Sequence, residues 1–482
     1  YLAKGNVAQA KQFIEGMIEQ RIQPATPTFL NAGRARRGEL VSCFLLEVDD
    51  SLNSINFIDS TAKQLSKIGG GVAINLSKLR ARGEAIKGIK GVAKGVLPVA
   101  KSLEGGFAYA DQLGQRPGAG AVYLNIFHYD VLEFLDTKKV NADEDIRLST
   151  ISTGLIVPSK FFDLAKEGKD FYMFAPHTVE REYGKTLDDI NLDEYYDELV
   201  ANPNIIKKAK DAREMLNTIA QTQLQSGYPY LMFKDNANKV HPNSDIGQIK
   251  MSNLCTEIFQ LQETSVINDY GTEDEIKRDI SCNLGSLNIV NVMESKKFRD
   301  SVHTGMDALT VVSDDTEIKN APGVRKANNE LHSVGLGVMN LHGYLAKNKI
   351  GYESEQAKDF ANVFFMMMNY YSIERSMEIA KERQETYVDF DKSDYASGKY
   401  FEKYTQEDIK PQFDNVADLF EGLDIPTAED WKALAEKVKE NGLYHAYRLA
   451  IAPTQSISYV QNATSSVMPI VDQIERRTYG HA

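Results

Sequence analysis

Residues 39–48 read ELVSCFLLEV, a run that is apolar on both of the faces that an extended chain presents. Strands with two apolar faces are typical of parallel sheets and barrels that helices cover on both sides. The segment 55–67, INFIDSTAKQLSK, is expected to be a helix, and 69–76, GGGVAINL, is expected to turn into a second strand. Further strands are predicted at 121–128, 170–176, 229–235 and 278–290. This alternation predicts an α/β fold.

Helices are predicted at 6–20, 355–383 and 428–442, so long helices dominate the end of the chain. A chain of 482 residues exceeds the size at which one core usually stops growing. It therefore forms either two domains or one large α/β barrel. We expect one barrel-like domain, because the candidate site residues come from both ends of the chain.

Composition excludes several classes of protein. Hydrophobic residues make up 42% and charged residues 26%, and neither a membrane-spanning run nor a signal peptide is present. Three cysteines are too few for a secreted disulfide scaffold, which indicates the reducing cytoplasm. The eight histidines are scattered without ligand spacing, so no metal site is expected. A net charge of −13 argues against nucleic-acid binding.

One stretch departs from this acidic balance. Between residues 78 and 101, seven cationic side chains stand against Glu84 alone, a local net charge of +6. The stretch is rich in glycine, which lets backbone N–H groups approach an anion, so it could form a polyphosphate site. A solvated loop is the alternative. The cations are Lys78, Arg80, Arg82, Lys87, Lys90, Lys94 and Lys101.

The stretch 252–259, SNLCTEIF, spaces an amide, a thiol and a carboxylate two residues apart. If it is extended, Asn253, Cys255 and Glu257 point to one side. A carboxylate near a thiol raises the pKa of the thiol, whereas cysteine nucleophiles need the thiolate. Hydrogen-atom transfer by the thiol, with the carboxylate as a general base on the substrate, fits this group better.

Four motifs, VSCFLLEVDDSLNSI, SNLCTEI, SCNLGSLN and APTQSISYVQNATSS, occur in this order. With them the chain resembles the large, catalytic subunit of class I ribonucleotide reductase, most closely the bacterial class Ib form. The resemblance runs from TPTFLNAG to IERRTYG. It implies a ten-stranded α/β barrel with a central finger loop that carries the radical cysteine. Residues 1–25 would end an N-terminal helical region, and 26–482 would form the catalytic barrel without its C-terminal part.

The resemblance also assigns roles to the cysteines and their neighbours. Cys255 would become a transient thiyl radical that removes the 3′-hydrogen of a ribonucleotide. Glu257 would take the proton of the 3′-hydroxyl group, and Asn253 would hold the reacting hydroxyl groups. Cys43 and Cys282 would supply two electrons and a proton while they close to a disulfide.

Residues 452–460, APTQSISYV, have the character of a phosphate-binding helix start. Pro453 suits the opening turn of a helix, Thr454 and Ser456 supply hydroxyl groups, and the first N–H groups of a helix attract a diphosphate. A plain helix cap is the alternative. The resemblance implies that the substrate diphosphate is bound by a larger set, namely Thr26, Ser42, Gly71, Pro453, Thr454, Gln455, Ser456 and Ile457.

In similar enzymes a dNTP or ATP bound at the interface of a homodimer selects which base is reduced. Asp50 aligns with the residue that holds the effector sugar, and Arg80 with one that meets its phosphates. Residues 138–149, KKVNADEDIRLS, fall where the family has the specificity loop that relays effector identity.

The resemblance implies that this chain binds no cofactor directly. A small (beta) subunit with a dimetal site of manganese or iron would supply the radical, and a glutaredoxin-like or thioredoxin-like protein would re-reduce the disulfide. The tyrosine pair and the C-terminal cysteines of the family would follow the end of this sequence, and Tyr479 is not taken as a substitute. Residues 1–482 alone are expected to bind nucleotides without turning over.

Three other functions fit parts of the sequence. An adenosylcobalamin-dependent (class II) reductase shares the Asn-x-Cys-x-Glu arrangement but needs no radical-generating subunit. A non-catalytic nucleotide-binding module would keep the effector site without needing all three cysteines. An unrelated thiol-dependent barrel enzyme would be expected to place a histidine or a metal ligand near its thiol.

Overall fold

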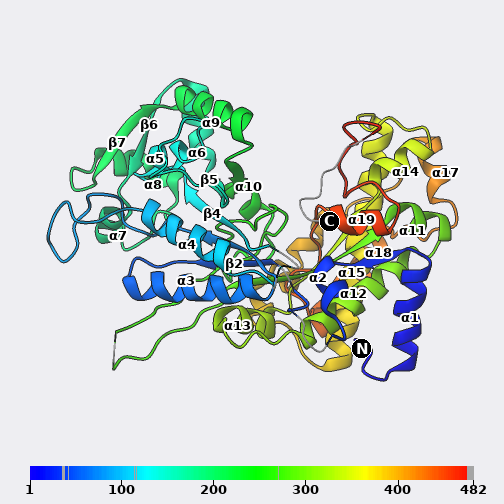
Figure 1. Cartoon of the computed structure of the whole chain (residues 1–482). Helices are drawn as coiled ribbons and strands as arrows, with labels where there is room; N and C mark the ends of the chain where they lie inside the picture. Colours follow the sequence, from blue (N-terminus) through cyan, green and yellow to red (C-terminus); the bar gives the residue numbers. More distant parts are fainter. Residues whose placement is uncertain (35–37, 42, 113, 115–116, 270, 475–482) are drawn as a thin grey trace. The chain divides into compact units, whose positions relative to one another are not determined.

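The computed structural model describes residues 1–474 except 35–37, 42, 113, 115–116 and 270. The chain divides into two compact units (Figure 1). Unit 1 comprises residues 1–33, 283–315 and 332–482, and unit 2 comprises residues 34–282 and 316–331. All three cysteines lie in unit 2.

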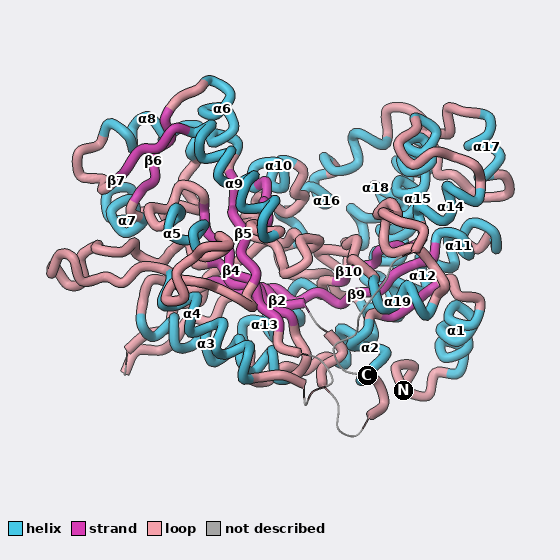
Figure 2. The backbone as a smooth tube through the Cα atoms, turned by 45° about the horizontal axis from the view of Figure 1, so that its top comes forward, coloured by secondary structure: helices cyan, strands magenta, loops and turns pink. Residues whose placement is uncertain are grey.

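Unit 2 is built on a mixed sheet. Its strands are β2 (Cys43–Glu47), β3 (Gly71–Asn75), β4 (Ala119–Asn125), β5 (Ser152–Val157) and β8 (Tyr230–Phe233), with the beginning of β9 (Ile280–Asn288). The order is β9–β2–β3–β4–β5–β8, in which β9 is antiparallel to β2 and the other neighbours are parallel. Figure 2 draws these strands in magenta and labels β9, β2, β4 and β5 among them. A separate antiparallel pair consists of β6 (Asp170–Phe174) and β7 (Lys207–Asp211).

The helices of unit 2 connect and cover these strands. They are α3 (Leu52–Lys67), α4 (Leu97–Tyr109), α5 (Val131–Asp136), α6 (Ser159–Glu167), α7 (Pro176–Tyr183), α8 (Leu192–Ala201), α9 (Ala212–Ser226), α10 (Lys234–Lys239) and α13 (Pro322–Leu331). The helices α3 and α4 pack against each other, α3 also packs against β2 and β3, and α4 against β4.

Burial explains why β2 is a central strand. Phe44, Leu45 and Leu46 are all fully buried, so both faces of β2 are covered. A strand without an exposed face needs apolar residues at every position, as the sequence predicts. The predicted α/β class is confirmed. The expected helices and strands are confirmed as well, and they correspond to α1 (Val7–Ile18), α3, β2, β3, β4, β6, β8, β9, α15 (Glu355–Arg383) and α18 (Ala428–Asn441).

Unit 1 is mainly helical. The end of β9 pairs with β1 (Ile22–Pro24) antiparallel and with β10 (Val334–Met339) parallel. The 29-residue helix α15 packs against α12 (Phe298–Asp315) and α18. The remaining helices of unit 1 are α2 (Thr26–Asn31), α11 (Ile289–Ser295), α14 (Leu341–Lys347), α16 (Asp394–Ser397), α17 (Asp414–Phe420) and α19 (Gln455–Val460), with 3₁₀ helices at Phe390–Lys392 and Lys399–Tyr404.

Candidate active site

Two of the three cysteines face each other across the sheet of unit 2. Cys43 opens β2 and is the direct partner of Cys282 in the antiparallel β2–β9 register. Directly opposed residues of such a pair have Cα atoms about 4.5–5.5 Å apart, which lies within the range that a disulfide bridges. Residues from distant parts of the sequence therefore meet in a geometry that permits a reversible disulfide.

The environment of Cys282 favours the neutral thiol. Its side chain is 1% exposed. Burial raises the pKa of the Cys282 thiol well above its ordinary value, and the nearby Cys43 and Glu257 raise it further. The thiol therefore keeps its proton at neutral pH and has a hydrogen to give, which suits radical chemistry better than thiolate attack.

The stretch around Cys255 is a turn and not a strand, so the one-sided arrangement expected for an extended chain is wrong. The Asn253 side-chain oxygen accepts hydrogen bonds from the backbone N–H groups of Glu257 (2.9 Å) and Ile258 (3.1 Å). The Thr256 N–H donates to the Asn253 carbonyl (3.2 Å). Asparagine forms such local bonds readily and competes with strand pairing. The turn leaves Cys255 exposed.

Thr256 has a backbone conformation that is unusual for its residue type. Its φ angle is +61°, in the left-handed region, which β-branched residues rarely adopt. Its hydroxyl group donates to the Cys255 carbonyl (2.8 Å). The chain direction beside Cys255 is thus fixed by a strained residue and by the hydrogen bonds of Asn253.

Asn253 also joins this turn to the cysteine pair. Its side-chain N–H₂ group lies 2.8 Å from Glu257 Oε2 and 3.9 Å from Cys43 Sγ. Burial raises the pKa of the Glu257 carboxyl above its ordinary value, and the hydrogen bond from Asn253 opposes this effect in part. A carboxylate with a raised pKa is a stronger base, so the group can take a proton from a substrate hydroxyl.

Tyr123 contributes to the site, although no motif in the sequence indicates it. Its hydroxyl group donates to the Asn253 carbonyl (2.8 Å) from within β4. Burial raises the pKa of Tyr123, and Tyr230, Cys255 and Glu257 raise it further, so these groups are near neighbours. In a predicted strand, a tyrosine that contacts the site cannot be distinguished by sequence from a tyrosine that only packs in the core.

The predicted substrate-binding residues of unit 2 are Gly71 and Ser42. Gly71 opens β3 and is the partner of Cys43 in the β2–β3 register, so it adjoins the cysteine pair. Ser42 lies outside the described residues, as does Tyr479.

The predicted substrate-binding residues of unit 1 include a pair of hydroxyl groups, since Thr26 Oγ1 and Ser456 Oγ are 2.8 Å apart. The helix α19 begins at Gln455 and is preceded by Thr454 with φ +57°. The expectation that Pro453 lies in the opening turn is therefore wrong, because Pro453 precedes the left-handed residue. The Ser466 N–H donates to Thr454 Oγ1 (2.7 Å). Gln455 is exposed, whereas Ile457 is buried.

The two predicted effector residues form an ion pair with each other. Arg80 Nε and NH2 both lie 2.8 Å from Asp50 Oδ2, and the Arg80 N–H donates to Asp50 Oδ1 (3.0 Å). Burial raises the pKa of Asp50, and Arg80 opposes this effect. The ion pair fixes the start of the basic stretch to the loop after β2.

Beyond Arg80 the basic stretch forms a hairpin, residues 83–93, that we call the basic arm. Ile86 and Ile89 pair with each other, and the Gly91 N–H donates to the Gly83 carbonyl (3.0 Å). Lys87 and Lys90 are exposed on this arm, with Arg82 and Lys94 beside its two ends. Lys78 is different, because it pairs with the buried Glu47 (2.9 Å) and belongs to the interior.

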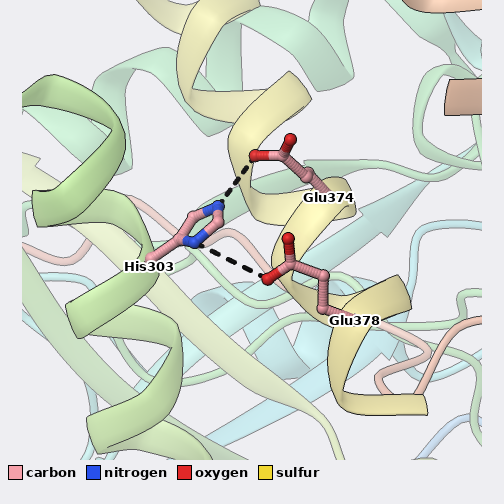
Figure 3. Close-up of side chains that lie close together, drawn as sticks. All are labelled: His303, Glu374 and Glu378. Atoms are coloured by element: carbon pink, nitrogen blue, oxygen red, sulfur yellow. Dashed lines mark hydrogen bonds and ion pairs between the residues drawn. The ribbon is translucent and has the colours of Figure 1, made fainter. Parts of the chain in front are cut away.

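Within the described part of unit 1, His303 on α12 and Glu374 and Glu378 on α15 form a group that could hold a metal ion (Figure 3). His303 Nε2 is 2.9 Å from Glu374 Oε2, and Nδ1 is 3.8 Å from Glu378 Oε2, so the ring lies between the carboxylates. Arg299 and Arg375 contact the same two oxygens at 2.8 and 3.0 Å. A metal ion would have to displace both guanidinium groups, which makes this cluster an ion-pair network between two helices.

No helix among the described residues is both long enough and apolar enough to cross a membrane.

A family model described as "Ribonucleotide reductase, barrel domain" matches residues 41–482. The ribonucleoside-diphosphate reductase subunit alpha of Bacillus subtilis is 56% identical over 482 residues, which cover 100% of this chain and 69% of that protein. The subunit of the same name from Mycoplasma pneumoniae is 45% identical over 490 residues, covering 100% of this chain and 67% of its own length.

Among solved structures, the alpha subunit of the class Id ribonucleotide reductase of Actinobacillus ureae has a TM-score of 0.66 to this chain. The match covers 95% of this chain and 68% of that one, at 22% sequence identity. At this identity the likeness concerns the fold.

Proposed function

The chain belongs to the ribonucleotide reductase barrel-domain family, and from this membership we propose that it reduces ribonucleoside diphosphates to 2′-deoxyribonucleoside diphosphates. The products are precursors of DNA. The relatives are named as alpha subunits, which favours a class I enzyme whose radical comes from a separate beta subunit. The alternative of an adenosylcobalamin-dependent reductase, which needs no such subunit, is not favoured.

The chemistry that we propose uses Cys255 as the radical carrier. Its thiyl radical takes the 3′-hydrogen atom of the ribose while Glu257 accepts the proton of the 3′-hydroxyl group. Cys43 and Cys282 each give up one hydrogen and form a disulfide: one hydrogen leaves with the 2′-hydroxyl group as water, and the other is added to C2′. The 3′-hydrogen then returns from Cys255, and Glu257 returns its proton to the 3′-oxygen. Each turnover thus consumes two thiols and yields one deoxynucleotide and one water molecule.

One observation carries this assignment. Cys43 is opposite Cys282 in the β2–β9 register, and the Asn253 amide contacts both Cys43 Sγ and Glu257 Oε2. A thiol pair able to close and a carboxylate of raised pKa are therefore joined by one amide, which supports a shared reaction. A non-catalytic module would have no use for this combination.

Binding of substrate and effector is assigned to two further sets of residues. We assign the diphosphate to Thr26, Ser42, Gly71 and residues 453–457, supported by the hydroxyl pair of Thr26 and Ser456. The effector, a dNTP or ATP, is assigned to Asp50, Arg80 and the basic arm, since exposed lysines on an acidic chain attract a triphosphate. We further propose a homodimer, a manganese or iron site in the beta subunit, a thioredoxin-like or glutaredoxin-like reductant, and the cytoplasm as compartment.

The experiment is a single-turnover assay of the complete subunit with its beta subunit, after reduction and removal of free thiols. We expect wild-type protein to form deoxynucleoside diphosphate in an amount limited by its cysteine pairs. Cys255→Ser should form none while it still binds a dNTP. Cys43→Ser and Cys282→Ser should each lose product formation, because either change removes one of the two electron donors.

A matched control is Ser281→Ala, which changes the neighbour of Cys282 on β9 and leaves the thiols in place. It should retain product formation. Repeated turnover by Cys43→Ser with thioredoxin as the reductant would contradict the assigned pair. Undiminished reduction by Cys255→Ser would remove the proposed mechanism altogether.

A further inference from the structure

Three adjacent strands of unit 2 place a glycine between two tyrosines, one on each neighbouring strand. Tyr123 of β4 is the register partner of Gly154 of β5, and Gly154 is the partner of Tyr230 of β8. Register partners share one face of a sheet. A Cβ atom at Gly154 would lie 2.4 Å from the Tyr123 ring. Glycine is therefore required there so that the Tyr123 ring can lie across β5 toward Tyr230.

This tyrosine row lies at the turn that carries the proposed radical cysteine. The Tyr123 hydroxyl group holds the Asn253 carbonyl at 2.8 Å. Burial raises the pKa of both Tyr123 and Tyr230, and Cys255 raises each of them further, so Cys255 is close to both. A hydrogen bond thus joins this row directly to the turn.

The other end of the row reaches residues 138–149. Tyr228 packs against Tyr230 with ring centroids 5.4 Å apart, and its hydroxyl group accepts a hydrogen bond from Ser152 Oγ (3.1 Å) at the start of β5. The Lys138 ammonium group lies 4.5 Å from the centre of the Tyr228 ring. This cation–π contact is well shielded from water, since Lys138 is 9% exposed.

Lys138 also closes the base of the segment. Its ammonium group donates to the Leu148 carbonyl (2.6 Å), and the Leu148 N–H donates to the Thr137 carbonyl (3.2 Å). Just beyond, Glu104 of α4 accepts from the N–H groups of Thr150 (2.6 Å) and Ile151 (3.2 Å). Any rearrangement of residues 138–149 that moves Leu148 must therefore move the ammonium group that covers Tyr228.

We propose that Lys138 and Tyr228 are positioning residues that couple the conformation of residues 138–149 to the turn carrying Cys255. This inference rests on the proposed function, since it presupposes radical chemistry at Cys255 and an effector that acts on residues 138–149. It adds a route by which the bound effector changes the rate of the chemical step. The route runs from Leu148 through Lys138, Tyr228 and Tyr230. It then crosses Gly154, the register partner of both Tyr230 and Tyr123, and reaches Asn253 through the Tyr123 hydroxyl group.

The test is Lys138→Met in the complete subunit assembled with its beta subunit. Methionine keeps the length of the side chain and loses both the charge and the hydrogen bond to Leu148. The four ribonucleoside diphosphates are assayed with and without each dNTP effector, and kcat and KM are determined separately. We expect the increase in kcat that the effector causes to be about tenfold smaller in Lys138→Met than in wild type, within the usual span of coupling between sites. The change in KM that the effector causes should be the same in both proteins.

The matched control is Lys185→Met, outside residues 138–149. Lys185 also lies over a tyrosine, 5.5 Å from the centre of the Tyr195 ring, so its loss removes the same charge and the same kind of contact. It should keep the full effector response. A Lys138→Met enzyme with the wild-type response of kcat, or an equal loss in Lys185→Met, would overturn the coupling.

A second pair of variants keeps the proposal testable if Lys138→Met is poorly folded. Tyr228→Phe retains the ring beneath Lys138 and loses the contact with Ser152, whereas Tyr228→Leu loses both. We expect the kcat response to fall more in Tyr228→Leu than in Tyr228→Phe. The double variant with Lys138→Met should lose no more than Lys138→Met alone, because both act through one contact. Additive losses would contradict this, and an inactive wild-type enzyme would instead refute the proposed function.

Discussion

Glu84 is a glutamate at the base of the basic arm with only 2% of its surface exposed. Its carboxylate accepts backbone N–H groups from Ala81 (2.6 Å) and from Thr178 (3.2 Å) in the first turn of α7. Burial raises the pKa of Glu84 to about 7, although these hydrogen bonds lower it. One side chain thus ties the basic stretch to a helix and changes charge near neutral pH.

This raised pKa predicts a pH-dependent stability. A carboxyl group whose pKa is higher in the folded state stabilises that state at low pH and loses this contribution as pH rises through the folded-state value. Between pH 5 and pH 8 the unfolding free energy of wild type should therefore fall relative to that of Glu84→Gln by about 2–3 kcal/mol. Urea unfolding of both proteins at each pH unit measures it. Parallel pH curves for the two proteins would contradict the raised pKa.

At the scale of elements, unit 1 depends on charges that link α12 to α15. Arg375 Nε lies 2.7 Å from Asp307 Oδ1, and Arg375 NH1 lies 2.8 Å from Glu382 Oε1. Burial raises the pKa of Asp307, and Arg375 opposes this effect. The network that includes His303 is therefore expected to serve helix packing and not metal binding.

Two measurements check this interpretation. Arg375→Met should lower the unfolding free energy by about 2 kcal/mol, because it leaves the largely buried Asp307 without its cation. Arg325→Met, which breaks a 3.7 Å contact with Glu317 at the surface, should change it by less than about 0.5 kcal/mol. Addition of Zn²⁺ should leave the Tm of wild type unchanged. A Zn²⁺-dependent rise that His303→Gln abolishes would show a metal site instead.

The elements were predictable from sequence to different degrees. An apolar run such as 39–48 and a long uninterrupted segment of helix-forming residues such as 355–383 each indicate their structure from local sequence alone, so β2 and α15 were predicted within a few residues. The turn around Cys255 was not, because alternation of polar and apolar residues fits a strand, and only the bonds of Asn253 make it a turn. Likewise, Pro453 suggested a helix start that the left-handed Thr454 delays.

At the scale of the whole molecule, contacts between distant residues could be predicted only through resemblance. No local property of Cys43 or Cys282 indicates that β2 and β9 are neighbours. The tyrosine row needs the register of three strands, which no single motif contains. The ion pair of Asp50 and Arg80 was also unexpected, since each had been assigned to the effector alone.

The charge distribution of the molecule leads to a prediction about effector binding. The chain carries a net charge of −13, yet the basic arm exposes Lys87 and Lys90. Lys87→Gln/Lys90→Gln should raise the Kd for a dNTP about threefold to tenfold at low ionic strength, and the difference should shrink as salt screens the charges. Isothermal titration at several salt concentrations measures this effect.

The control replaces two exposed lysines of α18, Lys437→Gln/Lys439→Gln, and should leave the Kd unchanged. Equal effects of both double variants would mean that only overall charge matters. An unchanged Kd in the arm variant would remove the arm from the effector site.

The left-handed backbone of Thr256 has a consequence for attempts to make this protein more robust. Glycine tolerates that conformation without cost, so Thr256→Gly should recover about 1 kcal/mol of strain. The same change would increase the conformational freedom of the neighbouring Cys255 thiol, so kcat should fall. Selection for thermostable variants would then lower catalytic activity, because the strain at Thr256 reduces stability but holds the neighbouring thiol in position.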